Sequence, residues 1–498
     1  MSSLSLLRRM KLKALAALSL FTLVVMLFVS NDSPLASINN HVDSAIFFMS
    51  GKAWANGLIP YVDFSDSKGP LLWFIEMIGY WMSPTDYHGV WILSVIVLSV
   101  TFYICWLTAM EVLQRPCLSL CVSMTMAIPY FFGFSFLETR AETWCTLPVI
   151  YGIYLVVRLI RQHHDGKIVS LTVWEAAWFG VAVMSCMLIK WSIAAMMMSL
   201  CLAVLLLSWK SGMRFVKSLG AFVAGATAIA LPFAAYLVCV GAFAPFIQEY
   251  FMATASTVGV GDASQLIGFY INEARKIYHS PISVLSIMLS LPGAYMLFRR
   301  YGIARWILPL CYCVFFLIGS YGNHWLYYLQ VSLSFALLGL IWIADRLNRL
   351  DDVSMKKSVF YGLCVGLTVV YLHSLYPVYH PGFDDTDYAN GDKIIALNHH
   401  KKEHPTILCY RTLDVGVGIS SEILPVSRYW FHQNGAVEDM KLHQDSILRS
   451  GQADFIYAND ADGCFSIIEN TGLYTCIWKS PQRTGQLTLG IWKKKATE

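Results

Sequence analysis

Long apolar runs separated by short polar loops fill the first three-quarters of the chain. A membrane-spanning helix needs about 20 mostly apolar residues. Stretches of this kind lie near 14–30, 89–113, 117–137, 142–160, 173–189, 191–208, 216–240, 281–298, 304–320, 325–344 and 358–376. Lys190 interrupts the stretch 173–208, which is either two short helices or one re-entrant unit. The pattern predicts a multi-pass α-helical membrane protein with about 11 transmembrane helices.

Lysine and arginine gather in alternate loops, and this alternation predicts the orientation. The clusters lie at 8–13, 115, 158–167, 210–217, 299–305 and 346–357. Short cytoplasmic loops carry an excess of these residues, and with eleven spans and a cytoplasmic amino end every cluster falls on the cytoplasmic side. The first apolar run resembles a signal peptide, but no small-x-small cleavage pattern follows it. We therefore expect an uncleaved first helix in the inner (plasma) membrane.

The opposite, extracytoplasmic side then receives three loops and the C-terminal tail. The loops are the long first loop 31–88, a short loop around 138–143 and a loop at 241–280. Loops of such length usually carry function, so the active site is expected on this side.

Charge separates the tail from the rest of the chain. Of the 68 charged residues, 27 lie in the last 122 positions, close to the roughly 25% charged content of soluble proteins. We expect a transmembrane domain at 1–376 and a soluble extracytoplasmic domain at 377–498. In the tail, strands are predicted at 406–410, 454–458 and 487–492 and a helix at 437–450, which together indicate a small α/β domain.

Several classes of function are excluded by composition. A net charge of +4 over 498 residues is too small to favour a nucleic-acid partner. No CxxC pair occurs, so a zinc or thioredoxin-like site has no support. Cys464 and Cys476 bracket a predicted hairpin and could pair in an oxidising compartment, or remain free thiols.

The first loop holds the densest group of candidate residues. Positions 42–56 have apolar residues at helical spacing, which predicts an amphipathic helix on the membrane surface. Asp43 lies in its first turn, where the helix dipole favours a carboxylate, although a plain capping role explains it equally well. Asp63, Asp66 and Lys68 follow within six residues, before an apolar stretch; a solvated ion pair is the alternative for them.

This loop resembles that of a known superfamily. Three features are similar to the first outer loop of GT-C glycosyltransferases. They are an Asp at the start of a juxtamembrane helix, the motif Gly57-x-x-Pro60-Tyr61-x-Asp63, and Lys68-Gly69-Pro70. The nearest branch is the bacterial group similar to protein O-mannosyltransferases and the lipid A aminoarabinose transferase. The segments around Lys190 and around His324 to Gln330, and the tail with Arg428-Tyr429, resemble that group as well. Many members of that group have the pair Asp-Glu at the start of this helix, whereas this chain has Asp43-Ser44. A second acidic residue must therefore come from elsewhere, and Glu138 or Glu142 is the natural source.

The resemblance implies a GT-C-like fold and a chemistry. Such enzymes transfer a sugar from a polyprenyl-phosphate donor to an extracytoplasmic acceptor, which is a glycan, lipid or protein. A carboxylate takes the acceptor's proton, and cations stabilise the departing lipid phosphate. The resemblance thus implies catalytic roles for Asp43, Glu138 and Glu142, and substrate binding by Asp63, Asp66, Lys68, Arg140, Lys190, Arg275, His324 and Tyr327. Some GT-C enzymes use a divalent cation, but no dedicated ligand set stands out, so no metal or other cofactor is expected.

Each of the other candidates also has a structural explanation. Glu138 or Glu142 could form an ion pair with Arg140, and Lys190 could extend to the membrane interface from a helix end. Arg275 could bind lipid headgroups, and His324 could belong to the aromatic belt beside Tyr327.

Two other functions compete with glycosyl transfer. An O-antigen-type polymerase would place arginines in its long outer loops, whereas the first outer loop has acids and no arginine. A multispanning transporter usually has repeated halves and mid-span charges, and neither is evident. Glycosyl transfer is therefore the prediction.

Overall fold

The computed structural model describes residues 3–36, 42–132, 139–253, 271, 281–320, 326–349, 395, 404–433, 437–481 and 487–496. The chain divides into two compact units. One, called here the helical unit, comprises Met1–Ser30, Leu93–Pro232 and Val260–Val378. The other, called the mixed unit, comprises Asn31–Ile92, Phe233–Gly259 and Tyr379–Glu498. The first loop and residues 241–259 thus group with the C-terminal tail, whereas the loop around 138–143 belongs to the helical unit.

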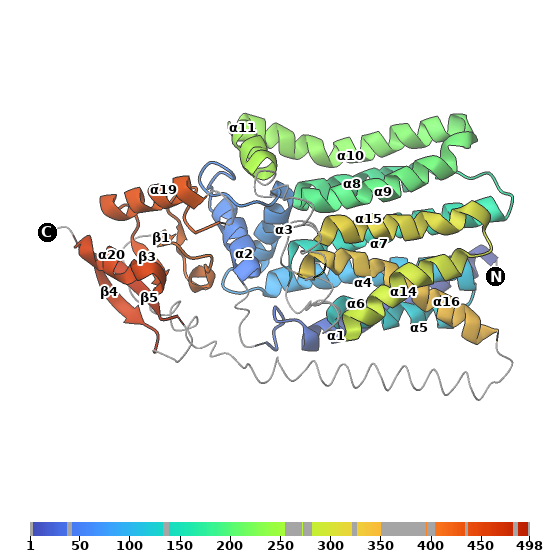
Figure 1. Cartoon of the computed structure of the whole chain (residues 1–498), viewed down its shortest axis with the longest axis horizontal. Coiled ribbons are helices and arrows are strands. Elements are labelled where there is room, and N and C mark those ends of the chain that lie inside the picture. Colours follow the sequence, from blue (N-terminus) through green and yellow to red (C-terminus); the bar gives the residue numbers. More distant parts are fainter. Residues whose placement is uncertain are drawn as a thin grey trace. The chain divides into compact units, whose positions relative to one another are not determined.

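The helical unit is built mainly from long apolar helices, drawn as the extended ribbons of Figure 1. Its elements, two of which extend into the mixed unit, are α1 (Ser3–Val29), α4 (His88–Leu113), α5 (Pro116–Thr125), α6 (Ala127–Phe132), α7 (Ala141–His164), α8 (Val173–Ile189), α9 (Trp191–Ser208), η1 (Trp209–Ser211), α10 (Met213–Cys239), α14 (Pro281–Phe298), η3 (Gly302–Trp306), α15 (Ile307–Ser320), η4 (Leu326–Phe335) and α16 (Ala336–Asn348). Helix α7 packs against α8 and α9, and α14 packs against α15 and α16.

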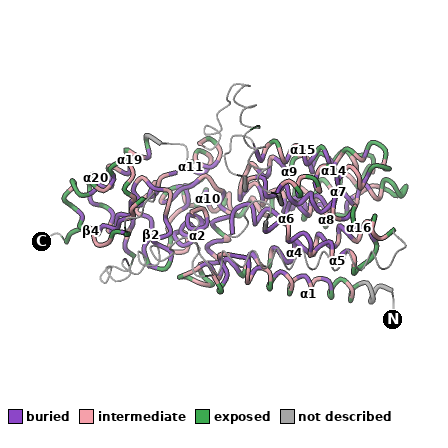
Figure 2. Tube along the Cα trace, turned by 60° about the horizontal axis from the view of Figure 1, so that its bottom comes forward, coloured by how far each residue is buried: buried purple, intermediate pink, exposed green. Residues whose placement is uncertain are grey.

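Burial distinguishes a central helix from a peripheral one. Among the seven candidate spans in the described residues, α7 is the most buried and α10 the least. Figure 2 shows buried residues concentrated along the inner helices of this unit. The α14–α16 contact depends on Gly293 and Gly339, because a Cβ on either residue would overlap the backbone of the other helix. Small residues commonly bring membrane helices this close.

The predicted spans are largely confirmed. In the part of the chain that the structure describes, seven helices are long and apolar enough to cross a membrane, and shorter apolar helices occupy Pro116–Phe131, Val173–Ile189 and Ser283–Phe298. Ten of the eleven predicted stretches thus coincide with apolar helices, and the stretch 358–376 lies outside the described residues. The protein is a multi-pass membrane protein with a small C-terminal α/β region.

The question around Lys190 is also resolved. Helix α8 begins with a capping box, in which Glu175 N donates to Thr172 Oγ1 at 3.2 Å and Thr172 N donates to Glu175 Oε2 at 2.9 Å. It ends at Lys190, whose extended backbone (φ −152°, ψ 102°) separates α8 from α9. The stretch 173–208 is therefore two packed helices.

Polar contacts join loops and helix ends within the helical unit. Arg161 Nη1 donates to the hydroxyl of Tyr301 at 3.1 Å, which joins two of the basic loops at one end of the unit. Lys190 and Glu142 meet where α8 ends and α7 begins.

The mixed unit combines helices from the loops with a C-terminal sheet. Its helical elements are α2 (Val42–Ala55), α3 (Pro70–Met82), α11 (Phe243–Phe246), η2 (Ile247–Ala253), η5 (Gly416–Gly418), α19 (Val437–Ser450), η6 (Ala461–Gly463) and α20 (Cys464–Asn470). Pro70 at the first turn of α3 suits a helix start. Helices α2 and α3 pack together closely, since a Cβ on Gly51 would overlap the backbone of α3.

The sheet has five strands in the order β2-β1-β3-β5-β4. The strands are β1 (Thr406–Cys409), β2 (Leu424–Pro425), β3 (Phe455–Asn459), β4 (Tyr474–Lys479) and β5 (Leu489–Lys494). Strand β1 is parallel to β2 and β3, whereas β5 is antiparallel to β3 and β4. Leu408, Ile456 and Trp492 from three strands and Ile447 from α19 share one hydrophobic core.

The tail prediction was right in outline and wrong in one detail. The predicted helix and three strands are present, while β2 and β4 were not predicted. The segment between Cys464 and Cys476 is a helix followed by a strand, not a hairpin. Both cysteines are free thiols.

Candidate functional site

A strained turn shapes the first loop. Tyr61 has a positive φ of 67°, a conformation that costs free energy for residues other than glycine. Its amide donates to Phe64 O at 2.7 Å, and its hydroxyl donates to Lys68 O at 2.8 Å. Burial, with nearby Tyr250, Asp66 and Glu249, raises the pKa of Tyr61 well above its usual value, so the hydroxyl remains a donor.

Asp63 supports the same turn. Its Oδ2 accepts a hydrogen bond from Ile59 N at 2.7 Å, and its own amide donates to Ile59 O at 2.9 Å. The side chain predicted to bind substrate therefore has a structural role in the turn.

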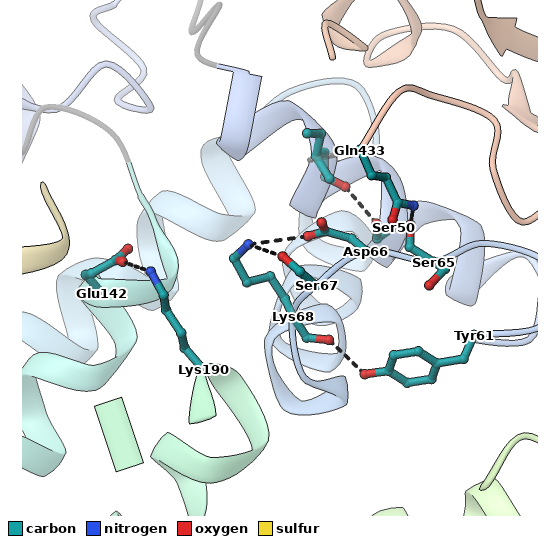
Figure 3. A network of polar contacts seen from close by, with 10 residues as sticks. Ser50, Tyr61, Ser65, Asp66, Ser67, Lys68, Glu142, Lys190 and Gln433 are labelled. Atoms are coloured by element: carbon teal, nitrogen blue, oxygen red, sulfur yellow. Dashed lines mark hydrogen bonds and ion pairs between the residues drawn. The ribbon is translucent and has the colours of Figure 1, made fainter. Parts of the chain in front are cut away.

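Asp66 and Lys68 form a charged pair at the end of this loop (Figure 3). Lys68 Nζ lies 3.7 Å from Asp66 Oδ2 and donates to Ser67 Oγ at 2.9 Å. Asp66 is buried, and its Oδ2 accepts no hydrogen bond. The loop thus presents a buried carboxylate oxygen with remaining acceptor capacity beside an ammonium group.

Helix α2 brings Asp43 into the same unit. Asp43 is half-buried in the first turn, where the helix dipole stabilises its ionised form. The helix is present as predicted. The prediction that it is amphipathic and lies on the membrane surface is wrong, because every residue from Ser44 to Ala53 is buried. Helix α3 and the segment of η5 and β2 in the C-terminal region pack against it.

Lys52, near the end of α2, is almost fully buried. It is 2% exposed, and its ammonium donates to the carbonyl oxygens of Gly418 (2.9 Å), Ile419 (3.5 Å) and Ser421. A buried ammonium is tolerated when its donors are satisfied in this way. The bonds fasten the helix that carries Asp43 to the C-terminal region.

Glu249 links three segments of the mixed unit. Its Oε1 accepts hydrogen bonds from Arg428 and from the Tyr429 hydroxyl, the latter at 2.9 Å. Its Oε2 accepts one from Ser65 Oγ at 3.4 Å. Gln433 also donates to the backbone carbonyl of Ser65.

A second charged cluster lies within the helical unit. Lys190 donates to Glu142 Oε1 (Figure 3) and lies 3.4 Å from the ring centroid of Tyr328. The side chains of Glu142 and Lys190 are 2% and 12% exposed. The Lys190 side chain is therefore largely enclosed by protein, and Glu142 has Lys190 as its ion-pair partner.

The remaining candidates are only partly described. Arg140 is buried directly before α7, and its amide donates to Thr143 Oγ1 at 3.0 Å. Glu138, Arg275 and His324 lie outside the described residues, as does the side chain of Tyr327. Among described residues, no group of three His, Cys, Asp or Glu side chains could hold a metal ion.

Sequence reasoning missed Lys52 and Glu249. The sequence does contain a sign of each residue's importance. Lys52 is the one cation in the apolar stretch 44–55, and Glu249 is the first acid after Glu175. Charges are scarce in this part of the chain, which could have marked both.

Comparison with known proteins identifies the class of fold. No family model matches the chain, and no curated protein matches it. Solved structures do match, and they are structures of GT-C enzymes whose fold this chain shares.

Two of these structures are of ArnT, the lipid A aminoarabinose transferase. ArnT from Cupriavidus metallidurans bound to undecaprenyl phosphate superposes with a TM-score of 0.61 at 13% identity, covering 96% of this chain and 97% of that one. Its apo state gives 0.62 at 12% identity over the same shares. An oligosaccharyltransferase from Archaeoglobus fulgidus, in complex with Zn and sulfate, gives only 0.48 at 11% identity over 96% and 72%.

Proposed function

We propose that this protein transfers a sugar from a polyprenyl-phosphate donor to an extracytoplasmic acceptor in the cell envelope. The observation that carries the proposal is a GT-C fold shared over nearly the whole chain with a protein that binds undecaprenyl phosphate. Buried charged groups at the predicted outer ends of the apolar helices supply residues for the reaction. The active site and the C-terminal domain would face the extracytoplasmic side.

Asp43 is the proposed general base. The acceptor's hydroxyl or amine attacks the anomeric carbon and gives its proton to the Asp43 carboxylate. The bond from the anomeric carbon to the phosphate oxygen breaks through an oxocarbenium-like transition state, and its electron pair leaves with the lipid phosphate. A displacement in one step inverts the anomeric centre.

The two lysines are proposed to stabilise the departing phosphate. Lys68 is a suitable point charge because Asp66 lies at ion-pair distance without accepting a hydrogen bond from it. Lys190 is paired with Glu142 and has a side chain that is only 12% exposed. In this proposal Glu142 is the second acid, and it sets the position of the Lys190 ammonium.

The remaining polar residues have supporting roles in this proposal. Asp66 accepts a hydrogen bond from a substrate hydroxyl at its buried oxygen. Arg140, Arg275, His324 and Tyr327 are kept as further contacts to the donor.

The test is single-turnover transfer by purified protein in lipid nanodiscs. Release of polyprenyl phosphate is measured with a panel of polyprenyl-phosphate sugars and an envelope extract as acceptor. We expect Asp43→Asn to lower the rate by about 10²–10⁴-fold, the usual contribution of a general base. Glu469→Gln, at an exposed ion pair, is the matched control and should retain the wild-type rate.

Two results would contradict the proposal. Full activity of Asp43→Asn would exclude Asp43 as the base. Failure of the wild-type protein to release phosphate from any donor would exclude the enzymatic function and favour transport.

A further inference from the structure

The Glu249 contacts suggest how the C-terminal region acts on the first loop. Arg428 and Tyr429 are separated from Glu249 by about 180 residues, yet both donate to the same carboxylate oxygen. The other oxygen accepts from Ser65, which directly precedes Asp66. One carboxylate therefore joins the C-terminal region, the segment 247–253 and the first loop.

Hydrogen bonds to backbone carbonyls also hold the first loop in place. Gln433 donates to the Ser65 carbonyl, and the Tyr61 hydroxyl donates to the Lys68 carbonyl. Ser65 is 1% exposed and Gln433 is 9% exposed, so water competes little for these bonds. The four residues 65–68 are thus fixed at both ends, and the end next to Asp66 is fixed by residues 428–433.

The donors in this network keep their protons at physiological pH. Burial and the hydrogen bond to Glu249 raise the pKa of Tyr429 to about 12. The guanidinium of Arg428 carries N–H donors and no acceptor. The carboxylate of Glu249 therefore keeps two donors from the C-terminal region under working conditions.

We propose that Arg428 is a positioning residue: through Glu249 and Ser65, it holds Asp66 and Lys68 in the geometry that binds the lipid phosphate of the donor. This inference rests on the proposed function. Without the guanidinium, the Glu249 carboxylate loses its charged donor from the C-terminal region, and the end of the loop next to Asp66 is held less firmly.

The first measurement is hydrogen exchange of the full chain in nanodiscs, comparing Arg428→Met with wild type. We expect faster exchange confined to residues 59–69 and 247–253. Arg449→Met, on an exposed arginine of α19, is the matched control and should leave these segments unchanged. Unchanged exchange in Arg428→Met, or equal loss over the whole chain, would overturn the proposal.

The second measurement is steady-state transfer with a polyprenyl-phosphate sugar. Arg428→Met should raise KM for the lipid donor about tenfold and change kcat less than twofold, because the substitution loosens donor binding. Arg428→Lys, which keeps the charge, should recover part of the loss. Arg428→Met combined with Glu249→Gln should be no worse than the poorer single variant, since both break one interaction.

The two proposals fail in different ways. A raised KM for the acceptor alone, with normal donor binding, would overturn the role given to Arg428. Faster exchange of 59–69 in a protein with no transferase activity would overturn the proposed function and, with it, the donor-binding role of Arg428.

Discussion

Replacing Lys52 with methionine tests how strongly α2 is fastened to the C-terminal region. Methionine keeps an unbranched side chain of similar length and removes the ammonium. The carbonyl oxygens of Gly418, Ile419 and Ser421 then lose a charged donor in a place that water does not reach. Hydrogen bonds to charged groups contribute about 1.5–3 kcal/mol each, and a carbonyl left without a partner costs about 1–3 kcal/mol.

An opposing effect limits the loss. The wild-type protein bears the desolvation of a buried ammonium, several kcal/mol, which the variant avoids. The variant loses three hydrogen bonds, two strong and one weak, and these outweigh the desolvation cost that it avoids. We therefore expect the free energy of unfolding to fall by about 3 kcal/mol. At about 1.4 kcal/mol per factor of ten, amides at the α2 contact should exchange about 100-fold faster.

The assay is native-state hydrogen exchange of residues 42–55 and 416–421 in the full chain. Lys495→Met is the matched control, because Lys495 also donates to a backbone carbonyl, that of Gly472 at 2.7 Å, but on the exposed surface. It should change exchange little, as surface contacts contribute little. An increase of less than threefold in Lys52→Met would refute the reasoning, since buried and exposed lysines would then be equivalent.

Two further predictions concern charge in each unit. Glu142→Gln and Lys190→Met should each destabilise the helical unit by about 3–5 kcal/mol, because each leaves the charge of its partner uncompensated. The double variant should recover most of that stability in thermal unfolding. It should not recover sugar transfer, measured as phosphate release. In the mixed unit, burial lowers the pKa of His432 and of His443. Between these lowered pKa values and pH 6.5, the unfolded chain binds more protons than the folded one. The stability contributed by the two neutral histidines is therefore complete above pH 6.5 and falls on acidification. The melting temperature should fall less from pH 7.5 to pH 5 in the double variant His432→Gln/His443→Gln than in wild type, and an equal fall would contradict the assignment.

Apolar patterning predicted the helices well because membrane spans require it. Ten predicted stretches coincide with helices, and the extended residue at Lys190 stands where a charge interrupts the apolar run. The scarcity of charge also singled out Glu142 and Lys190 separately. Their pairing depends on the packing of α7 against α8, which no local pattern contains.

The first loop shows what patterning cannot predict. Apolar residues at Val42, Ile46 and Met49 indicated one buried face for α2, and the structure buries the other face as well. The covering segment, 416–425, is more than 360 positions away in sequence. Glu249 was overlooked for the same reason, because its partners Ser65 and Arg428 come from distant segments.

Charged contacts between distant segments argue for geometry rather than stability. Glu142–Lys190, Lys52 with its three carbonyls, and Glu249–Arg428 each join segments 48 or more positions apart. Apolar side chains of similar volume would often serve stability as well or better. Unlike an apolar contact, a charged contact has a fixed donor and acceptor, so it allows one register between the segments it joins. In the mixed unit, this register determines how α2 presents Asp43 and how the first loop presents Asp66 and Lys68, which are the residues that the proposed reaction needs in a defined position.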